Sequence, residues 1–305
     1  RICVEEPDIN EMVYAMGYEA IGDLEVPKRA DYIRSIILEL ARIQGHIFSI
    51  GGNAADINQY TVMQWGTLTR DYILDLFEEI TGGRVYHIYI RPGGVRQDIE
   101  DETFEHILEV MDDLEENRLP DLDKALYENP NAHKRWKGKA VITEEEAIEM
   151  GATGPVLRAN GKPYDVRKMM PYAAYDEVDF EIPTGENGDA WDRLKIMREE
   201  MTQSIKIIRQ LINNIPEGPV KLDLGNALKY RIPEGDAYVK IESKRGEYGS
   251  YMVSDGGLKP YRVHVRGASN PLGLYGVTEY LPGTRVADVP VWAKSLGICP
   301  PEFDR

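Results

Sequence analysis

Hydrophobic residues in the first part of the chain recur with helical spacing. Over residues 26–50 they return every three or four positions, with Pro27 near the start and Gly51-Gly52 at the end. Residues 69–80 also have one apolar face, and Gly82-Gly83 follows them. Both segments are predicted to be amphipathic helices that bury one side and end at their glycine pairs.

Two more helical segments follow. "DETFEHILEVMDDLEENRL" predicts an acidic helix whose charges form a solvated face, and residues 117–140 predict a polar connection with room for one further helix. Residues 189–213 carry the longest regular pattern and predict another helix. Its expected buried stripe consists of Trp191, Leu194, Met197, Met201, Ile205, Ile208 and Leu211.

Near the C-terminal third the pattern changes from helical spacing to alternation. "AYVKIES", "GSYMVSD" and "YRVHVRG" alternate apolar and polar residues and are separated by "KRGEY" and "GGLKP", which predicts an antiparallel meander. Earlier, "RVYHIYI" before "RPGG" predicts a short strand or extended segment that ends in a tight turn. The fold class is therefore α+β, helix-dominated, with a small antiparallel sheet. No repeat is visible, so residues 1–305 are expected to form a single domain.

The composition and net charge of the chain argue against some classes of binding partner. A chain of 305 residues with 42% hydrophobic residues can bury a large core, and a net charge of −16 argues against nucleic acid or anionic lipid as a partner. The sequence has no hydrophobic run near 18 residues and only two cysteines, which predicts a soluble intracellular protein. Because the sequence begins at Arg1 rather than Met, we expect that an N-terminal portion is missing.

The two cysteines lie at opposite ends of the chain in matching settings. Cys3 precedes Glu6 by three positions, and Cys299 precedes Glu302 in the same way. Thiolate metal sites usually need four ligands, so C-x-x-E is weak evidence, and two unrelated buried cysteines would explain it as well. The five histidines lack H-x-x-x-H spacing, and no dinucleotide fingerprint, P-loop or G-x-S-x-G is present.

Several long segments together resemble one protein family. They are "RADYIRSIILELARIQGHI", "RDYILDLFEEITGGR", "IRPGGVRQDI", "ATGPVLRANGKPYDVRK", "PTGENGDAWDRLKIMREEMTQSIKIIRQ" and "SKRGEYGSYMVSDGGLKPYRVHVR". In this order, over nearly the whole chain, they are similar to the D subunit of the proton-pumping NADH:quinone oxidoreductases, the complex I family.

The resemblance implies a core like that of the large subunit of nickel-iron hydrogenases, in which two C-x-x-C pairs hold the metal centre. "RICVEEP" and "GICPPEFDR" are similar to these pairs, with Glu6 and Glu302 in place of the second cysteines. The resemblance therefore implies no metal and no nickel-iron centre here, and a cavity free for another ligand. It implies that Val4, Met63, Cys3 and Cys299 line an acceptor pocket that faces an iron–sulfur cluster of a partner subunit.

The resemblance also implies an ionisable set that supplies protons to the acceptor. Glu6, Glu302 and Asp56 are its members, because carboxylates in a dry cavity have raised pKa values. Asp56 aligns with an aspartate that pairs with a histidine of an N-terminal hairpin, which would precede this sequence. The alternative is that Glu6 and Glu302 form only structural ion pairs with arginines such as Arg91 or Arg305.

Two departures from the family bear on the acceptor. Val4 stands where quinone-reducing members carry the tyrosine that binds the headgroup, and Tyr86 stands where members carry histidine, with His87 one position along. Tyr86, His87 and Arg91 are expected beside the partner's cluster, although Arg91 could equally form a structural ion pair. Retention of Cys3 and Cys299, together with loss of the headgroup-binding tyrosine, suggests an archaeal-type relative, such as a reduced-deazaflavin dehydrogenase, with quinone or methanophenazine as acceptor and with NADH or reduced deazaflavin as donor.

The resemblance also implies which subunits this chain contacts and where the chain is located. The implied partners are the cluster-bearing B subunit, the C and I subunits, and the H subunit in the membrane, with the chain peripheral on the cytoplasmic face of the membrane. Its role would be to couple electron transfer to proton translocation. The alternative is an inert hydrogenase-like scaffold, and the two hypotheses differ in whether the ends bearing Cys3 and Cys299 meet around an open cavity.

Overall fold

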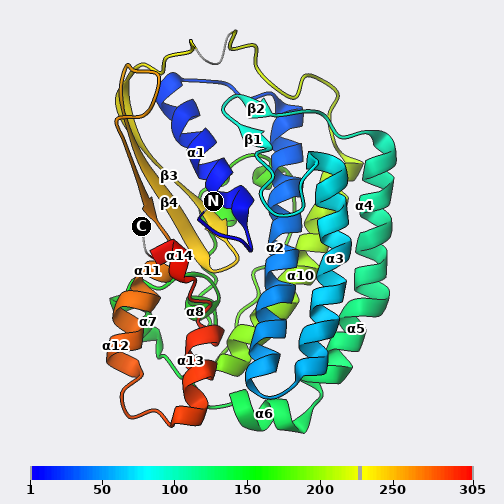
Figure 1. Cartoon of the computed structure of the whole chain (residues 1–305), viewed down its shortest axis with the longest axis vertical. Coiled ribbons are helices and arrows are strands. Elements are labelled where there is room, and N and C mark those ends of the chain that lie inside the picture. The colour runs from blue at the N-terminus through cyan, green and yellow to red at the C-terminus, as the bar shows by residue number, and fades with distance from the viewer. Residues whose placement is uncertain (1, 226–228, 304–305) are drawn as a thin grey trace.

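Four long helices pack side by side in the molecule (Figure 1). The computed structural model describes residues 2–225 and 229–303, with side chains to residue 302. Helix α2 (Lys28–Asp56) contacts α3 (Tyr60–Thr81) and α10 (Ala190–Asn213), and α3 contacts α4 (Asp101–Asp113). Most elements along the described chain are helices, which confirms the helix-dominated fold class. Helix α2 is buried over most of its length.

A three-stranded antiparallel sheet flanks these helices (Figure 1). Its strands are β3 (Glu234–Ser243), β4 (Gly246–Asp255) and β5 (Arg262–Arg266), in that order. Helix α1 (Pro7–Gly22) packs against β3 and β4. The predicted meander is confirmed. A smaller hairpin joins β1 (Ile90–Arg91) to β2 (Gly94–Val95), where the sequence predicted an extended segment and a tight turn.

Shorter elements connect these parts and form a lobe near the C-terminus (Figure 1). Between α4 and α10 lie η1 (Leu114–Arg118), α5 (Leu119–Leu122), η2 (Asp123–Tyr127), α6 (Pro130–Trp136), α7 (Glu144–Glu149), α8 (Gly154–Arg158), α9 (Val166–Met169) and η3 (Tyr175–Glu177). After β5 come α11 (Ser269–Pro271), η4 (Leu272–Gly276), α12 (Val277–Tyr280), η5 (Val286–Asp288), α13 (Val289–Ser295) and α14 (Pro300–Phe303).

The structure corrects two of the predicted helix boundaries. Helix α2 does not stop at Gly51-Gly52 but continues through both glycines to Asp56. A Cβ at Gly51 would lie 3.5 Å from the Cα of Met63 on α3. Helix α3 begins at Tyr60, earlier than predicted, and ends as expected at Gly82, which has φ of 75°.

The acidic helix is also longer than its sequence indicated. It runs from α4 through two π-helical turns, η1 and η2, to Tyr127, so the polar connection predicted from residue 117 is wrong. The π turns shift the helical register, and Leu119, Leu122 and Leu126 remain buried along the extension. The further helix is present as α6, and the predicted buried stripe of α10 is confirmed at all seven positions.

Candidate functional site

The turn between β3 and β4 carries two buried cations. Ser243 pairs with Gly246, so Lys244 and Arg245 form the tip of a two-residue hairpin, and both are at most 3% exposed. Hairpin tips are usually solvated, whereas this one is inserted between α2 and the two ends of the chain. The ammonium of Lys244 donates to the carbonyl oxygen of Gly45 (2.7 Å) and to Ser49 Oγ (2.6 Å) on α2.

Glycine permits this insertion on the opposite side. Gly154, at the start of α8, has φ of 63°, and a Cβ there would lie 2.3 Å from the carbonyl oxygen of Arg245. Gly246 has φ of 124°, and its own Cβ would meet Thr153 and Gly154 at under 3.0 Å. The hairpin and the first turn of α8 therefore meet backbone to backbone, which fixes the position of Arg245.

The N-terminal segment approaches Arg245 with a thiol and two carboxylates. Arg245 Nη2 donates to Cys3 Sγ (2.9 Å), and Nη1 donates to Glu5 Oε2 (3.0 Å). Glu5 also pairs with the Lys244 ammonium. Glu6 accepts the Lys244 backbone N–H at Oε1 (2.9 Å), and its Oε2 lies 3.7 Å from Arg245 Nη2.

The C-terminal segment reaches the same guanidinium from another side. Arg245 Nε donates to Glu302 Oε2 (2.7 Å), and Ser269 N donates to Glu302 Oε1 (2.9 Å). Ser269 Oγ accepts the backbone N–H of Cys299 (3.1 Å). The two halves of the predicted site, nearly three hundred residues apart in sequence, are thus brought together around Arg245.

Cys3 and Cys299 are both free cysteines, and the pKa values of the two thiols depend on each other. The hydrogen bond from the Cys299 thiol, together with the positive charge of Arg245, lowers the pKa of Cys3 to about 5, although burial opposes the shift. The same hydrogen bond raises the pKa of Cys299. At neutral pH the pair therefore shares one proton, with the thiolate on the side of Arg245.

The carboxylates beside Arg245 differ in their protonation. Burial raises the pKa of Glu6 to about 7, although Arg245 and Lys244 oppose the shift. Burial also acts on Glu5, but Lys244 and Arg245 outweigh it and lower the pKa of that carboxyl. Two cations thus face the Cys3 thiol and three carboxyl groups, and Glu6 is the member of the Glu5–Glu6 pair that can hold a proton near neutral pH.

This arrangement does not suit a thiolate-held nickel-iron centre. The guanidinium of Arg245 contacts Cys3 and Glu302, the residues that would hold a metal, and one positive charge would repel another. Among the residues that the structure describes, no group of three or more His, Cys, Asp or Glu side chains has metal-binding geometry.

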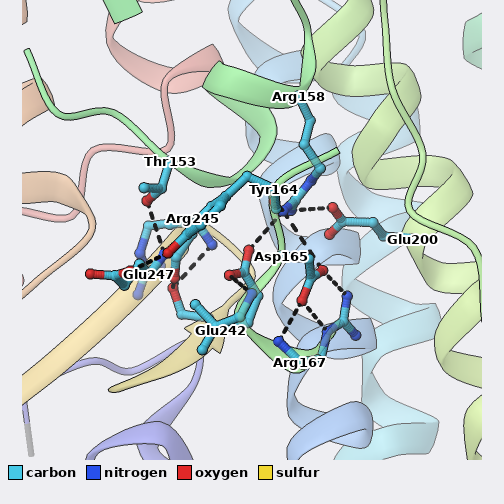
Figure 2. A network of polar contacts seen from close by, with 12 residues as sticks. Thr153, Arg158, Tyr164, Asp165, Arg167, Glu200, Glu242, Arg245 and Glu247 are labelled. Carbon is cyan, nitrogen blue, oxygen red and sulfur yellow. Dashed lines mark hydrogen bonds and ion pairs between the residues drawn. The ribbon is translucent and has the colours of Figure 1, made fainter. Parts of the chain in front are cut away.

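A network of buried ion pairs lies next to the β3–β4 hairpin and includes Glu242 of β3 (Figure 2). Arg158 on α8 pairs with Glu242 Oε1 on β3 (2.7 Å) and with Glu200 on α10. His46 on α2 lies 2.7 Å from Glu200, and burial lowers the pKa of His46 to about 4, so the imidazole is neutral. The network ties α2, α8, α10 and β3 together two residues before Lys244, so it holds the hairpin tip in place.

Within the network, Glu242 and Glu200 carry different charges. Burial and the negative charge of Asp165 raise the pKa of Glu242 to about 7, whereas Arg158 and the hydrogen bond from His46 lower the pKa of Glu200 against the effect of burial. Arg42 donates to the carbonyl oxygen of Glu242 (2.7 Å). Glu242 is therefore a second buried carboxyl that holds a proton near neutral pH.

The two apolar residues expected to line the pocket lie at the surface. Val4 is 50% exposed beside Cys3, and Met63 is 39% exposed on α3. Met63 lines a depression of about 430 Å³ together with Gln64 and Leu68. Neither side chain is buried against the thiols, and Met63 lies on α3 rather than at either end of the chain.

Asp56 has a partner of its own within this chain. Lys294 of α13 donates to Asp56 Oδ1 (2.9 Å) at the C-terminal end of α2. Asp56 lies seven residues beyond Ser49, which contacts Lys244, and seven residues of helix span about 10 Å. The structure thus places Asp56 apart from Glu6 and Glu302.

The three residues expected near a partner's cluster do not share one environment. His87 is buried, stacks on Phe77 and lies 2.8 Å from Asp8 at the start of α1, so it faces inward. Tyr86 and Arg91 instead line an apolar cavity of about 490 Å³ that also includes Ile2 and Pro7. This cavity reaches the segment that carries Cys3.

A carboxylate of α1 holds the loop between these residues. Glu11 accepts three consecutive backbone N–H groups, from Ile88 (2.6 Å), Tyr89 (2.8 Å) and Ile90 (3.0 Å). Ile88 has φ of 49°, a conformation that β-branched residues rarely adopt, and its side chain is 57% exposed. The loop is thereby fixed relative to α1, which begins directly after Glu6.

Sequence reasoning missed the cations at the centre of the site. Lys244 and Arg245 were assigned to a strand separator, and Arg91 was named as a structural partner of Glu6 and Glu302 in place of Arg245. Arg305, the other partner named, lies outside the described residues. The available signal was the pair of adjacent cations between two alternating strands, where solvent exposure is the usual outcome.

Comparisons with known proteins agree over the whole chain. A family profile described as "Respiratory-chain NADH dehydrogenase, 49 Kd subunit" matches residues 56–229 and 225–305. The D subunit of the NADH-quinone oxidoreductase of Thermosipho melanesiensis is 53% identical over 100% of this chain and 83% of its own length. The corresponding protein of Desulforamulus reducens is 40% identical over 95% of this chain and 78% of its own length.

A solved structure is similar over the same range. A chain of a membrane-bound sulfane sulfur reductase, described as an archaeal respiratory membrane complex, superimposes with a TM-score of 0.96 at 44% identity. The match covers 100% of this chain and 83% of that chain. Among the described helices, none combines the length and apolar character needed to cross a membrane.

Proposed function

Because the chain belongs to the family of the 49 kDa subunit of respiratory-chain NADH dehydrogenases, we propose that it forms the terminal acceptor site of a respiratory oxidoreductase complex. Its relatives are the D subunits of NADH-quinone oxidoreductases, which belong to the peripheral arm of a respiratory complex. In this proposal the electrons come from an iron–sulfur cluster of a neighbouring subunit and reach an acceptor beside Arg245.

The convergence of both chain ends on Arg245 carries this proposal. An acceptor that takes up electrons develops negative charge, and Arg245 and Lys244 are fixed cations that would stabilise this charge in a site of low polarity. Glu6 lies beside them with its pKa raised by burial to about 7, so it can supply a proton. Glu302 positions the guanidinium, because it accepts a hydrogen bond from Arg245 Nε.

The first candidate for the acceptor is a quinone or methanophenazine, with NADH or reduced deazaflavin as the donor to the complex. The apolar cavity lined by Ile2, Pro7, Tyr86 and Arg91 has a volume of about 490 Å³, which suits an aromatic headgroup. Val4 replaces the headgroup-binding tyrosine of quinone-reducing members, which favours an acceptor that needs no hydrogen bond from this position.

A sulfane sulfur compound is the second candidate, and a specific observation favours it. Cys3 and Cys299 present adjacent thiols beside a guanidinium, which suits a small anionic sulfur chain better than a bulky ring. The archaeal complex whose chain is 44% identical to this one is described as a sulfane sulfur reductase. In this case Arg245 would bind the anion.

The family also guides the proposal on partners and location. We place the chain on the cytoplasmic side of the membrane, between a cluster-bearing B subunit, the C and I subunits, and the H subunit in the membrane. The exposed face of Tyr86, Ile88 and Arg91 would meet the cluster-bearing partner. The reaction at Arg245 would then begin the events that end in proton translocation within the membrane.

Electron transfer by the purified whole complex tests the proposal. Rates with a water-soluble quinone, a water-soluble phenazine and inorganic tetrasulfide would be compared in wild type, Val4→Tyr and Arg245→Gln. Arg245→Gln is expected to lower the rate with every acceptor at least tenfold, since it removes the fixed charge. Val4→Tyr is expected to shift preference toward quinone only if a ring binds beside residue 4.

The exposed pair of Lys162 and Glu144 offers a control, because Lys162→Gln removes a surface cation outside the site. Its rates should equal those of wild type. If Arg245→Gln reduces all three acceptors as fast as Lys162→Gln does, the acceptor is reduced elsewhere and the chain is a scaffold.

A further inference from the structure

The buried ammonium of Lys244 has a partner for each of its hydrogen-bond donors. An ammonium group carries three N–H donors. That of Lys244 donates to the carbonyl oxygen of Gly45 (2.7 Å) and to Ser49 Oγ (2.6 Å), and it pairs with Glu5 Oε2. The side chain is 2% exposed. This cation is therefore bound by the chain itself and keeps no donor for a molecule that enters the site.

Arg245 differs from its neighbour in this respect. A guanidinium carries five N–H donors. Among the residues that the structure describes, Nε donates to Glu302, Nη1 donates to Glu5 and Nη2 donates to Cys3 Sγ. Nη2 also lies 3.7 Å from Glu6 Oε2, which is beyond hydrogen-bond distance. Within this part of the chain, N–H groups on Nη1 and Nη2 thus remain free to donate to an acceptor.

Glu5 connects the two cations. Its Oε2 atom contacts the Lys244 ammonium and also accepts from Nη1 of Arg245 at 3.0 Å. Because Lys244 is anchored on α2, it fixes the position of this carboxylate. The carboxylate in turn fixes one arm of the guanidinium, so direct contacts lead from α2 through Lys244 and Glu5 to Arg245.

Helix α2 has a socket for Lys244 that consists of Gly45 and Ser49. The two residues are four positions apart and lie on the same face of the helix. Gly45 leaves room for the aliphatic part of the lysine, because a Cβ there would lie 2.7 Å from Lys244 Cδ. The same Cβ would lie 3.4 Å from Glu6 Cγ. A side chain at position 45 would therefore displace Lys244 and crowd the N-terminal segment.

We propose that Lys244 is a positioning residue of the acceptor site: held by Gly45 and Ser49, it fixes Glu5 and thereby orients the free N–H groups of Arg245 toward the acceptor. This inference rests on the proposed function, because it takes Arg245 as the group that binds the acceptor. It assigns different roles to two adjacent cations. Arg245 contacts the acceptor, whereas Lys244, besides the field of its charge, acts through Arg245.

Glycine-to-alanine variants of α2 separate the position of Lys244 from its charge. Gly45→Ala retains every charge of the site but displaces the lysine, so kcat/KM of the purified whole complex should fall about fivefold or more. The acceptor is whichever of the water-soluble quinone, the phenazine and inorganic tetrasulfide wild type reduces fastest, and rates are normalised to reduction of a viologen dye as a measure of assembled complex. Gly52→Ala is the matched control on the same helix, because the nearest atom to a Cβ there is Lys294 Cδ at 4.0 Å. Equal kcat/KM values for the two variants would overturn the proposal.

Variants of Ser49 test the anchor without changing a glycine. Ser49→Ala removes one partner of the ammonium and should lower kcat/KM about threefold or more. Alanine favours helix more than serine does, so weakening of α2 would not explain this loss. Ser49→Thr keeps the hydroxyl, and the residue is only partly buried, so this variant should recover most of the lost activity. Equal kcat/KM values for Ser49→Ala and Ser49→Thr would contradict the role of the hydroxyl and with it the proposal.

A double-mutant cycle tests whether Lys244 acts through Arg245. Lys244→Met alone should lower kcat/KM about tenfold or more, since Glu5 loses its anchor. In the Arg245→Gln background the same substitution should cost about threefold or less, because the group that Lys244 positions is already absent. A larger further loss in that background would show that Lys244 acts on the acceptor directly, and the positioning role would be wrong.

The two proposals can fail separately. If Arg245→Gln lowers the rate but Gly45→Ala and Lys244→Met do not, the positioning role is wrong and the proposed function stands. If Arg245→Gln is as fast as Lys162→Gln with all three acceptors, the proposed function fails, and the positioning role fails with it.

Discussion

Arg245 Nε donates to Glu302 Oε2 at 2.7 Å, and the side chains of both residues are at most 1% exposed. The same guanidinium contacts Cys3 and Glu5, so a single side chain at a hairpin tip holds both ends of the chain. Burying this cation is favourable only because each of its donors meets an anionic or polarisable partner.

Removing the guanidinium should therefore destabilise the fold. Arg245→Met leaves Glu302 and the Cys3 thiolate without their cation, and breaking a buried ion pair from one side costs about 3–5 kcal/mol. Arg245→Lys keeps the charge but loses the fork geometry of the guanidinium. Its free energy of unfolding should therefore lie between those of wild type and Arg245→Met. Urea unfolding of the three proteins measures the differences, and a loss below about 1 kcal/mol for Arg245→Met would contradict the assigned role.

The pH dependence of stability should reveal the buried proton on Glu6. Its pKa is about 7 in the folded chain, mainly because of burial, and about 4.3 in unfolded chains. A raised pKa gives a stabilising contribution that is complete below the unfolded value and is lost as pH rises through 7. Relative to Glu6→Gln, wild type should thus lose stability on the order of 3 kcal/mol between pH 4 and pH 8.

Glu5 provides a matched control of opposite sign. Lys244 and Arg245 lower its pKa despite burial, so its contribution is present above the unfolded value and is lost as pH falls below it. Wild type relative to Glu5→Gln should be more stable at pH 7 than at pH 3. Parallel pH profiles for the two variants would mean that the two carboxyl groups do not differ as described.

The order of helices and strands along the chain could be predicted from the sequence, whereas the residues at the centre of the site could not. The seven-residue stripe of α10 follows directly from burial on one face, and the antiparallel pairing of β3 to β5 agrees with their alternating sequences. By contrast, Gly51-Gly52 looked like a helix stop, whereas α2 continues through both glycines to Asp56. A glycine has no side chain, so its sequence pattern does not reveal whether its role is a turn or a close contact.

Lys244 and Arg245 illustrate the limit for charged residues. Local pattern predicts a solvated turn, and only the tertiary contacts with Cys3, Glu5 and Glu302 make their burial favourable. The resemblance to a family predicted that Cys3 and Cys299 meet, but not which cation lies between the ends. Likewise, His87 was expected beside the partner's cluster, and its contact with Asp8 follows from the position of α1 rather than from any local motif.

The hydrogen bond between the thiols can be tested through the pKa of Cys3. Cys299→Ala removes the donor that is the largest cause of the lowered pKa, so the pKa of Cys3 should rise from about 5 toward the ordinary value of about 8.5. Cys299→Ser keeps an O–H donor and should give an intermediate value. Thiolate absorbance at about 240 nm during a pH titration of the isolated chain reports on Cys3 alone in both variants.

The backbone contact between the β3–β4 hairpin tip and α8 can be tested with a closely matched control. Gly154 and Gly151 both have positive φ, 63° and 71°, so alanine strains the backbone similarly at either position. A Cβ at Gly154 would lie 2.3 Å from the Arg245 carbonyl oxygen, whereas a Cβ at Gly151 meets nothing within 4 Å.

Gly151→Ala should cost about 1–2 kcal/mol of unfolding free energy from backbone strain alone. Gly154→Ala should cost at least about 2 kcal/mol more, because it forces the hairpin away from α8. It should also raise the pKa of Cys3 by displacing Arg245, which Gly151→Ala should leave unchanged. Equal unfolding free energies for the two variants would show that the close approach of the two backbones does not fix Arg245.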